Sequence, residues 1–330
     1  MEPCQNEQPL SQQKPFAPFL ASSFQIKGEK GIYYGASSYN EKHNMIIACP
    51  YDASLQFYNA TTFLPSEGFE TEQLDSSVHV MSFWPETETY LLGCILGNIY
   101  TYNLSKKILK KIQSQTESHI IAITFLNSKY YAFSDCDSYQ LSLGNLENGE
   151  LLRFNLVGFE TLGLCCFAKR KLLVSILSSN SRGSLRIYRT DQLPKLPVIS
   201  SIQGFSYEGE IASRQIQSMT INGKEYLITA GYDFPLRIWH FSKGKIKLLK
   251  VIQMGERSHD VAYLENYKML ATTYKGLELR FLKFPSGRLE SSVYLLNQQL
   301  CLGIFLILDK NILGVPSYSE NKINIVKFSS

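Results

Sequence analysis

The sequence predicts an all-β fold, a seven-bladed β-propeller in which each blade is a four-stranded antiparallel sheet. One strand pattern recurs seven times along the 330 residues, small residues recur on the strand before it, and aromatic residues reach 12% of the chain. Planar and β-branched side chains pack well on a pleated sheet, so this enrichment favours strands over helices. A hydrophobic fraction of 44% against 19% charged residues predicts a large buried core rather than a disordered chain.

The recurring pattern is an alternating strand that ends on a large apolar residue. Its last residues are Tyr58, Tyr102, Leu143, Tyr188, Trp239, Leu282 and Val326. Successive members lie 41 to 51 residues apart, with a mean of about 45. Four strands of about six residues with four connections of about four residues need about 40 residues. Each period therefore predicts one four-stranded antiparallel unit.

Small residues recur near the end of the strand that precedes each of these. They are Ala48, Cys49, Gly93, Ser134, Ser175, Thr229, Ala230, Thr272, Thr273 and Gly314. Ordinary strand preferences would not place small residues there repeatedly, whereas they fit the crowded inner layers of a propeller blade.

The repeats resemble the WD-repeat family over roughly residues 20–330, and the best match is the stretch 226–239, Tyr-Leu-Ile-Thr-Ala-Gly-Tyr-Asp-Phe-Pro-Leu-Arg-Ile-Trp. In that family a turn Asp, a strand Ser or Thr, a His before the first strand and a Trp form a hydrogen-bonded network inside a blade. The resemblance implies this structural role for Asp52, His119, Ser134, Asp137, Thr229, Asp233, Trp239 and His259. No repeat holds the full set, so number and spacing carry the resemblance.

The two ends of the chain are predicted to close the ring. The seventh unit lacks a fourth strand, because the chain ends soon after Val326. Residues 19–27 precede the first unit and can pair as the missing strand, which removes an open sheet edge. The expected organisation is a flexible tail rich in Gln and Pro at residues 1–18 and a single propeller at residues 19–330.

No catalytic, cofactor or metal site is predicted, and we expect the protein not to be an enzyme. The five histidines show no metal-ligand spacing, and the common hydrolase, dinucleotide and phosphate-loop motifs do not occur. A turn explains Asp135 and Asp137 better than paired catalytic carboxylates do. The enzymatic alternative is a lactonase-like propeller hydrolase, which needs acid, base or metal groups converging near the central channel.

Aromatic residues at turns are the predicted partner-binding sites. Tyr51 and Tyr232 precede turn aspartates at the propeller rim, where WD-repeat relatives commonly hold peptides, and similarity places Tyr318 near a corresponding turn. Tyrosine combines a large rigid apolar area with one hydroxyl, as binding hot spots require. Trp84 falls on the opposite turn, where either a partner or a neighbouring loop covers it.

Two lysine clusters, at residues 106–111 and 243–250, directly follow third strands and are predicted to lie on outer strands. Lysines on an exposed edge discourage edge-to-edge pairing. Binding of an acidic partner, a lipid headgroup or nucleic acid is the alternative role. The longest separation between units predicts an insertion at residues 191–213, which is a candidate docking element.

These features predict a noncatalytic scaffold that binds other proteins through its rim loops, as a subunit or adaptor of a larger intracellular assembly. The alternatives are a propeller that binds phosphoinositides or nucleic acid, and the hydrolase. The seven cysteines never show CxxC spacing and the N-terminus lacks an export signal, so we expect reduced thiols and a cytoplasmic location, with nuclear or cytoskeletal association open. The net charge of +4 neither indicates nor excludes a polyanionic partner.

Overall fold

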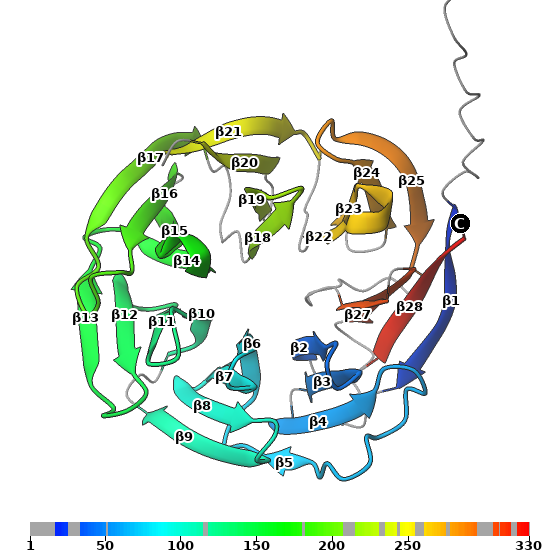
Figure 1. The fold of residues 1–330 in the computed structure, drawn as a ribbon, viewed down its shortest axis with the longest axis horizontal. Helices are drawn as coiled ribbons and strands as arrows, with labels where there is room; N and C mark the ends of the chain where they lie inside the picture. The colour runs from blue at the N-terminus through cyan, green and yellow to red at the C-terminus, as the bar shows by residue number, and fades with distance from the viewer. Residues whose placement is uncertain are drawn as a thin grey trace, which may run out of the picture.

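Seven four-stranded antiparallel sheets form a closed ring (Figure 1), and the predicted seven-bladed β-propeller is confirmed. The structure is a computed structural model that describes residues 17–25, 34–50, 52–114, 118–179, 182–206, 215–230, 235–242, 245–254, 261–274, 278–295, 306–309, 311–317 and 322–329. In these residues no helix has the length and apolar composition that a membrane span requires.

Blades 1 to 6 each place their four strands in chain order from the centre of the ring outward. The strands of blades 1 to 3 are β2 (Tyr34–Asn40), β3 (Met45–Pro50), β4 (Ser54–Asn59), β5 (Glu72–Gln73), β6 (Val78–Trp84), β7 (Thr89–Cys94), β8 (Asn98–Asn103), β9 (Ile108–Ser114), β10 (Ile120–Phe125), β11 (Tyr130–Asp135), β12 (Gln140–Asn145) and β13 (Leu151–Asn155). Those of blades 4 to 6 are β14 (Glu160–Phe167), β15 (Leu172–Ser179), β16 (Arg182–Arg189), β17 (Val198–Ser206), β18 (Gln215–Ile221), β19 (Lys224–Ala230), β20 (Leu236–Ser242), β21 (Lys245–Ile252), β22 (Val261–Leu264), β23 (Met269–Tyr274), β24 (Glu278–Lys283) and β25 (Arg288–Tyr294). The 3-10 helices η1 (Ala168–Arg170) and η2 (Glu265–Tyr267) lie between the first and second strands of blades 4 and 6.

Blade 7 joins the two ends of the chain. It contains β26 (Leu306–Asp309), β27 (Ile312–Ser317) and β28 (Lys322–Ser329), and its outer strand is β1 (Ala17–Gln25). β1 runs antiparallel to β28, with Ala17 opposite Ser329 and Gln25 opposite Lys322. Figure 1 shows the two strands side by side at the edge of the ring. The predicted closure by an N-terminal strand is therefore confirmed, with the strand starting at residue 17 rather than 19.

The recurring alternating strand is the third strand of every blade. Its seven members are β4, β8, β12, β16, β20, β24 and β28. The terminal apolar residue of each is buried. The sequence period therefore corresponds to one blade.

Small residues on the second strands let neighbouring blades approach closely. A β-carbon at Gly93 of β7 would lie 2.6 Å from Cγ2 of Ile120 in blade 3 and 2.9 Å from Cγ2 of Val80 in β6. Any side chain at this position would push the two blades apart, because interiors are packed to crystal-like density. The other predicted small residues on second strands are also buried.

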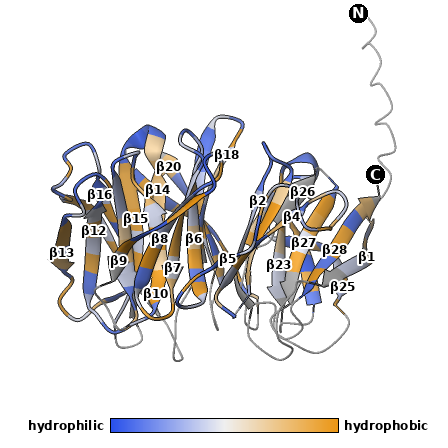
Figure 2. Ribbon diagram, turned by 90° about the horizontal axis from the view of Figure 1, so that it is seen from below, coloured by the Kyte–Doolittle hydropathy of each residue, from blue (hydrophilic) through white to orange (hydrophobic). Residues whose placement is uncertain are grey.

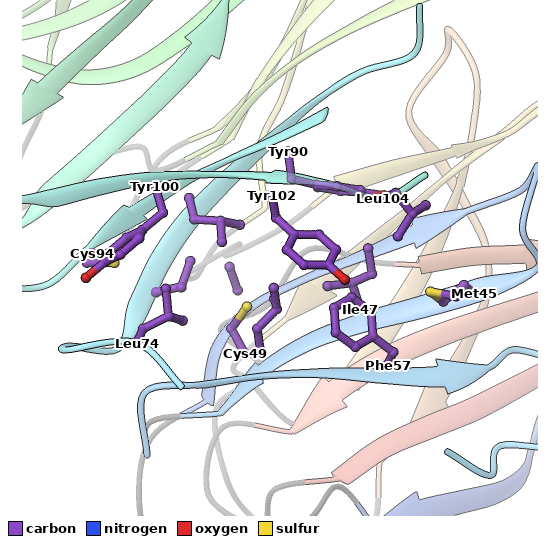
Figure 3. Packing of buried hydrophobic residues seen from close by; sticks show 14 residues of the cluster. Met45, Ile47, Cys49, Phe57, Leu74, Tyr90, Cys94, Tyr100, Tyr102 and Leu104 are labelled. Carbon is purple, nitrogen blue, oxygen red and sulfur yellow. The ribbon is translucent and has the colours of Figure 1, made fainter. Parts of the chain in front are cut away.

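The core consists of apolar layers between adjacent blades. Figure 3 shows the layer between blades 1 and 2, where Tyr102 of β8 points toward Ile47 of β3 and Phe57 of β4. The ring centroids of Phe57 and Tyr102 are 5.1 Å apart. Burial raises the pKa of the Cys94 thiol in this layer to about 12, so this cysteine is uncharged and behaves as a small apolar side chain.

The long separation between the fourth and fifth repeats is largely a strand. Residues 198–206 form β17, the outer strand of blade 4, which corrects the predicted insertion at residues 191–213. The turn before β17 packs onto the blade, because Leu196 is buried and the Pro197 carbonyl accepts a hydrogen bond from the Arg189 N–H at 3.0 Å. Residues 207–214 lie outside the described residues.

Glu88 links the turns between the first and second strands of blades 1 and 2. Its carboxylate accepts a hydrogen bond from Lys42, and its Oε1 lies 3.2 Å from His43 Nε2. The Lys42 ammonium is the main cause that holds the pKa of Glu88 below its ordinary value of 4.5. A carboxyl group whose pKa is lowered by folding stabilises the protein above its unfolded pKa and loses that contribution when it is protonated.

We expect Glu88→Gln to destabilise the protein at neutral pH. The difference in the free energy of unfolding between wild type and variant should shrink as the pH falls below about 4.5, because the wild-type carboxylate then takes up a proton. Urea unfolding over a series of pH values measures this. Glu86 is exposed in the same turn, and Glu86→Gln is the control that should behave like wild type. A difference that persists undiminished in acid would contradict the role of the Glu88 charge.

Candidate protein-binding face

Antiparallel pairing divides the connections of the propeller between two opposite faces, as the side view in Figure 2 shows. We name one side the connection face, because it carries the links from blade to blade and the turns between second and third strands. We name the other side the hairpin face, because it carries the turns between first and second strands and between third and fourth strands. Over blades 1 to 4, the described part of the connection face comprises residues 52–53, 74–77, 95–97, 118–119, 136–139 and 156–159.

Three large apolar side chains are exposed on this described part of the connection face. They are Leu96, with 56% of its surface exposed, Tyr139, with 50%, and Val157, with 79%. Tyr139 and Val157 are neighbours, because the Leu156 N–H donates a hydrogen bond to the Tyr139 carbonyl at 2.8 Å. Leu96 lies in the corresponding turn of the adjacent blade 2. Exposed aromatic and aliphatic groups on fixed turns are what a protein partner can cover.

Val157 is held in a strained backbone conformation. Its φ is 38°, a left-handed value that β-branched residues rarely adopt. The Asn155 side-chain carbonyl accepts a hydrogen bond from the Val157 N–H at 2.9 Å, and Gly158 follows with a φ of 76°. The turn thus presents an apolar side chain to solvent in a conformation that costs of order 1–3 kcal/mol, and strain of this kind concentrates at binding sites.

Hydrogen bonds beneath Tyr139 fix its turn. The buried carboxylate of Asp135 accepts a hydrogen bond from the Ser138 N–H at 2.7 Å. The Asp137 N–H donates to Ser118 Oγ at 3.2 Å, and the Cys136 N–H donates to the His119 carbonyl at 3.0 Å. The turn is therefore tied to the connection that enters blade 3, so little conformational entropy is lost when a partner covers Tyr139.

Sequence reasoning missed Tyr139 because it searched for a tyrosine directly before a turn aspartate. Tyr139 follows Asp137 by two residues instead. The predicted partner-binding residues Tyr51, Tyr232 and Tyr318 lie outside the described residues. A broader sequence pattern, an aromatic residue at any position of a turn between second and third strands, would have predicted Tyr139.

Trp84 ends β6 on the hairpin face and is half-buried. Its ring lies 5.9 Å from that of Phe125 in blade 3, and its indole Nε1 is buried without a hydrogen-bond partner among the described residues. Of the two alternatives left open by the sequence, this geometry favours packing against the neighbouring blade over contact with a partner.

The structure brings together two members of the expected blade network. In blade 5, the indole N–H of Trp239 donates a buried hydrogen bond to Thr229 Oγ1 at 3.1 Å. Ser175 and Tyr188 make the equivalent contact in blade 4, where the Ser175 hydroxyl donates to the Tyr188 hydroxyl at 3.5 Å. Tyrosine therefore occupies the place of tryptophan in that blade. Asp233 and His259 lie outside the described residues.

Blade 3 does not assemble its expected set. The side chains of His119 and Asp137 are exposed, whereas Ser134 is buried and its hydroxyl donates to the Thr161 carbonyl of blade 4 at 3.0 Å. Asp135, two residues before Asp137, is the buried turn carboxylate. The spacing from the third strand thus pointed to the wrong aspartate, because it does not reveal which of the two carboxylates points inward.

Asp52 begins a ladder of hydrogen bonds along β4. Its Oδ1 accepts from both the N–H and the hydroxyl of Ser54, at 3.0 and 2.5 Å. Ser54 Oγ accepts from the Gln56 amide at 2.7 Å, and Gln56 Oε1 accepts from the Tyr58 hydroxyl at 2.5 Å. Asp52 thus fixes the start of β4 through Ser54, and its place in the blade network stays a prediction. Polar residues at every second position of a buried strand were the sequence signal for its partners Ser54 and Gln56.

Within the described part of the chain, no group of three or more His, Cys, Asp or Glu side chains is placed to hold a metal ion.

No protein-family model and no curated protein sequence matches the chain. Among solved structures, the chain is similar to the β-propeller domain of Cps50 (Swd1) from Myceliophteria thermophila, with a TM-score of 0.73 and 13% sequence identity. The match covers 95% of this chain and 100% of that domain. At this identity the similarity shows the fold alone, and the two chains share the β-propeller architecture.

Proposed function

We propose that this chain is a propeller of the WD-repeat type that serves as a noncatalytic scaffold and binds protein partners on its connection face. The repeat spacing, the hydrogen bond between Thr229 and Trp239 and the similarity to the Cps50 (Swd1) propeller support the WD-repeat assignment. The architecture supports the scaffold role, because a closed ring of sheets holds many exposed turns at fixed relative positions.

The observation that carries this proposal is the adjacent pair Tyr139 and Val157. Both side chains are exposed, and hydrogen bonds fix both turns. The backbone of Val157 is strained, and the exposure of its apolar side chain to water gives no free energy that would compensate for this strain. Covering these two side chains with a partner would bury rigid apolar surface at little cost in side-chain entropy, as interface hot spots do.

The test is partner capture with Tyr139→Ala combined with Val157→Gly. Glycine accommodates the left-handed backbone at position 157, so we expect the variant to remain folded. Recovery of the partners should fall at least about tenfold, because each hot-spot side chain contributes roughly 2 kcal/mol or more. Affinity purification from cells, with quantitative mass spectrometry of the captured proteins, measures this.

Leu64 provides the matched control. It is exposed by 64% in the loop between the third and fourth strands of blade 1, away from the connection face. Leu64→Ala removes a comparable exposed apolar group and should leave partner recovery unchanged. Full recovery of every partner with the folded double variant, or a loss that appears equally with Leu64→Ala, would refute a binding site at Tyr139 and Val157.

A further inference from the structure

The hairpin face differs in charge between its two halves. Over blades 1 to 3, its turns carry seven carboxylates and four lysines. The carboxylates are Glu41, Glu67, Glu70, Glu86, Glu88, Glu147 and Glu150, and the lysines are Lys42, Lys106, Lys107 and Lys129. Lys42 pairs with Glu88, Lys129 pairs with Glu147, and Lys107 donates a hydrogen bond to the Gly68 carbonyl. The turns of this half therefore carry more carboxylates than lysines, and most of these lysines are engaged within the protein.

Over blades 4 to 6 the same face, with the outer strand of blade 5, carries a set of exposed lysines that we name the basic crescent. Its members are Lys169, Lys171, Lys195, Lys224, Lys245, Lys247, Lys250, Lys268 and Lys283. None of these lysines forms an ion pair among the described residues, whereas the neighbouring Arg170, Arg189 and Arg288 pair with Glu225, Asp191 and Glu290. Glu265 is the one carboxylate of these described turns outside an ion pair. Three carboxylates of this region thus pair with arginines, and no ion pair among the described residues balances the positive charge of the lysines.

The pairing of β21 places its three lysines on one side of the sheet. Lys245 lies opposite Ser242 and Lys247 opposite His240. A register shift at the next residues then sets Lys250 opposite Ile238, so the three lysines follow alternate positions of β20. Leu248 lies opposite Trp239 and therefore points to the other side. Without this bulge, Lys250 would lie on the same side of β21 as Leu248. The bulge therefore places all three lysines on one side of the strand.

The chemistry of the basic crescent fits a row of phosphates better than a protein or a membrane. Interface cores in proteins are rich in aromatic and apolar anchors and poor in lysine. Peripheral membrane binding needs several apolar groups beside the charges. On β21, Leu248 is on the opposite side, and Leu249 in the bulge is the one exposed apolar side chain next to Lys250. A nucleic-acid backbone needs only cations, since binding releases its condensed counterions.

The aromatic rings of the same turns favour a duplex over a single strand. The Tyr267 hydroxyl donates to Asn311 Oδ1 at 2.6 Å, and the Phe284 ring lies 5.1 Å from Tyr226 and 5.4 Å from Tyr263. These rings are packed within the protein, so they offer no platform on which unpaired bases could stack. We propose that the basic crescent binds a nucleic-acid duplex through its phosphates, without reading the base sequence, on the face opposite to the proposed protein-binding site.

The experiment is fluorescence anisotropy of the full chain with a labelled DNA duplex of about 24 base pairs, roughly two helical turns, titrated between about 50 and 200 mM salt. The test variant combines Lys169→Glu, Lys224→Glu and Lys283→Glu, one lysine from each blade. We expect at least a roughly 30-fold weaker affinity at 100 mM salt, and a salt-dependence slope that is smaller by about 3, because each phosphate contact contributes close to one.

The matched control reverses three lysines elsewhere, Lys106→Glu, Lys110→Glu and Lys327→Glu, which are exposed and outside the basic crescent. The change in net charge is identical, so its affinity should stay within about threefold of wild type if the position of the charge matters. An RNA duplex of the same sequence should bind within about threefold of DNA, since lysines that read phosphates do not distinguish the sugar. If the glutamate variant unfolds, the corresponding glutamine triple should still weaken binding roughly tenfold.

Three outcomes would overturn the proposal. The first is no duplex binding by the wild-type protein at about 50 mM salt. The second is an equal loss of affinity in the test and control variants. The third is that the same lysines bind phosphatidylserine vesicles or poly-glutamate, and that the duplex does not displace these ligands. This result would assign the basic crescent to a membrane or to an acidic protein.

Discussion

Replacing Tyr90 by alanine should lower the free energy of unfolding by about 3–5 kcal/mol, as removal of a fully buried aromatic ring does. Tyr90 of β7 is only 1% exposed and belongs to the layer between blades 1 and 2. Its ring lies 4.5 Å from that of Phe83 in the same blade, and its hydroxyl accepts a hydrogen bond from the Asn40 amide of blade 1 at 3.3 Å. Alanine would leave a cavity between two blades and would remove the acceptor of the Asn40 side-chain N–H. Chemical denaturation monitored by circular dichroism measures the loss.

Tyr90→Phe is the control for this prediction. It keeps the ring and removes only the hydroxyl, so it should cost about 1 kcal/mol, the value of one intramolecular hydrogen bond. If alanine costs no more than phenylalanine, the ring does not hold the two blades together, and the packing described between blades 1 and 2 is wrong.

Removing residues 1–25 should destabilise the protein by roughly 4–8 kcal/mol, at about 1 kcal/mol for each lost hydrogen bond between β1 and β28. The pairing joins eight residues of β1 to β28, from Ala17 opposite Ser329 to Gln25 opposite Lys322. Without β1, the edge of β28 is open, and an unpaired edge strand associates with other chains. Denaturation measures the lost stability, and size-exclusion chromatography should show oligomers.

A shorter truncation that removes residues 1–16 is the control, because it leaves β1 intact. We expect its stability to stay near that of wild type, since the sequence predicts a tail in this region. Equal stability of both truncated proteins would show that β1 contributes nothing to closure of the ring.

The architecture of the protein was accessible from the sequence because it repeats. Each third strand combines an alternating pattern with a terminal large apolar residue, and both arise from a strand that is buried in the same way in every blade. The missing outer strand of the last unit followed from counting alone. The Thr229 and Trp239 pair was also within reach, because both residues lie on adjacent strands of one blade, ten positions apart.

The candidate surfaces were less accessible, because they depend on the direction in which a side chain points. Asp135 and Asp137 are equally plausible turn carboxylates in the sequence, and only the folded turn buries one of them. The same is true of the strained Val157, whose exposure depends on the hydrogen bond from its N–H to Asn155. The motif of a tyrosine directly before a turn aspartate therefore predicted Tyr51 and Tyr232 but not Tyr139.

The sequence by itself determined the number of blades, their order and the closure of the ring, since local periodicity encodes them. The tertiary structure decided which charges act together. The lysine cluster at 106–111 contributes Lys111 to an ion pair with Asp75. The described lysines of the second cluster, Lys245, Lys247 and Lys250, instead lie on the blade between those that carry Lys169 and Lys283. Residues about one repeat apart in the chain become neighbours only when the ring closes, so a surface built from several blades leaves no continuous trace in the sequence.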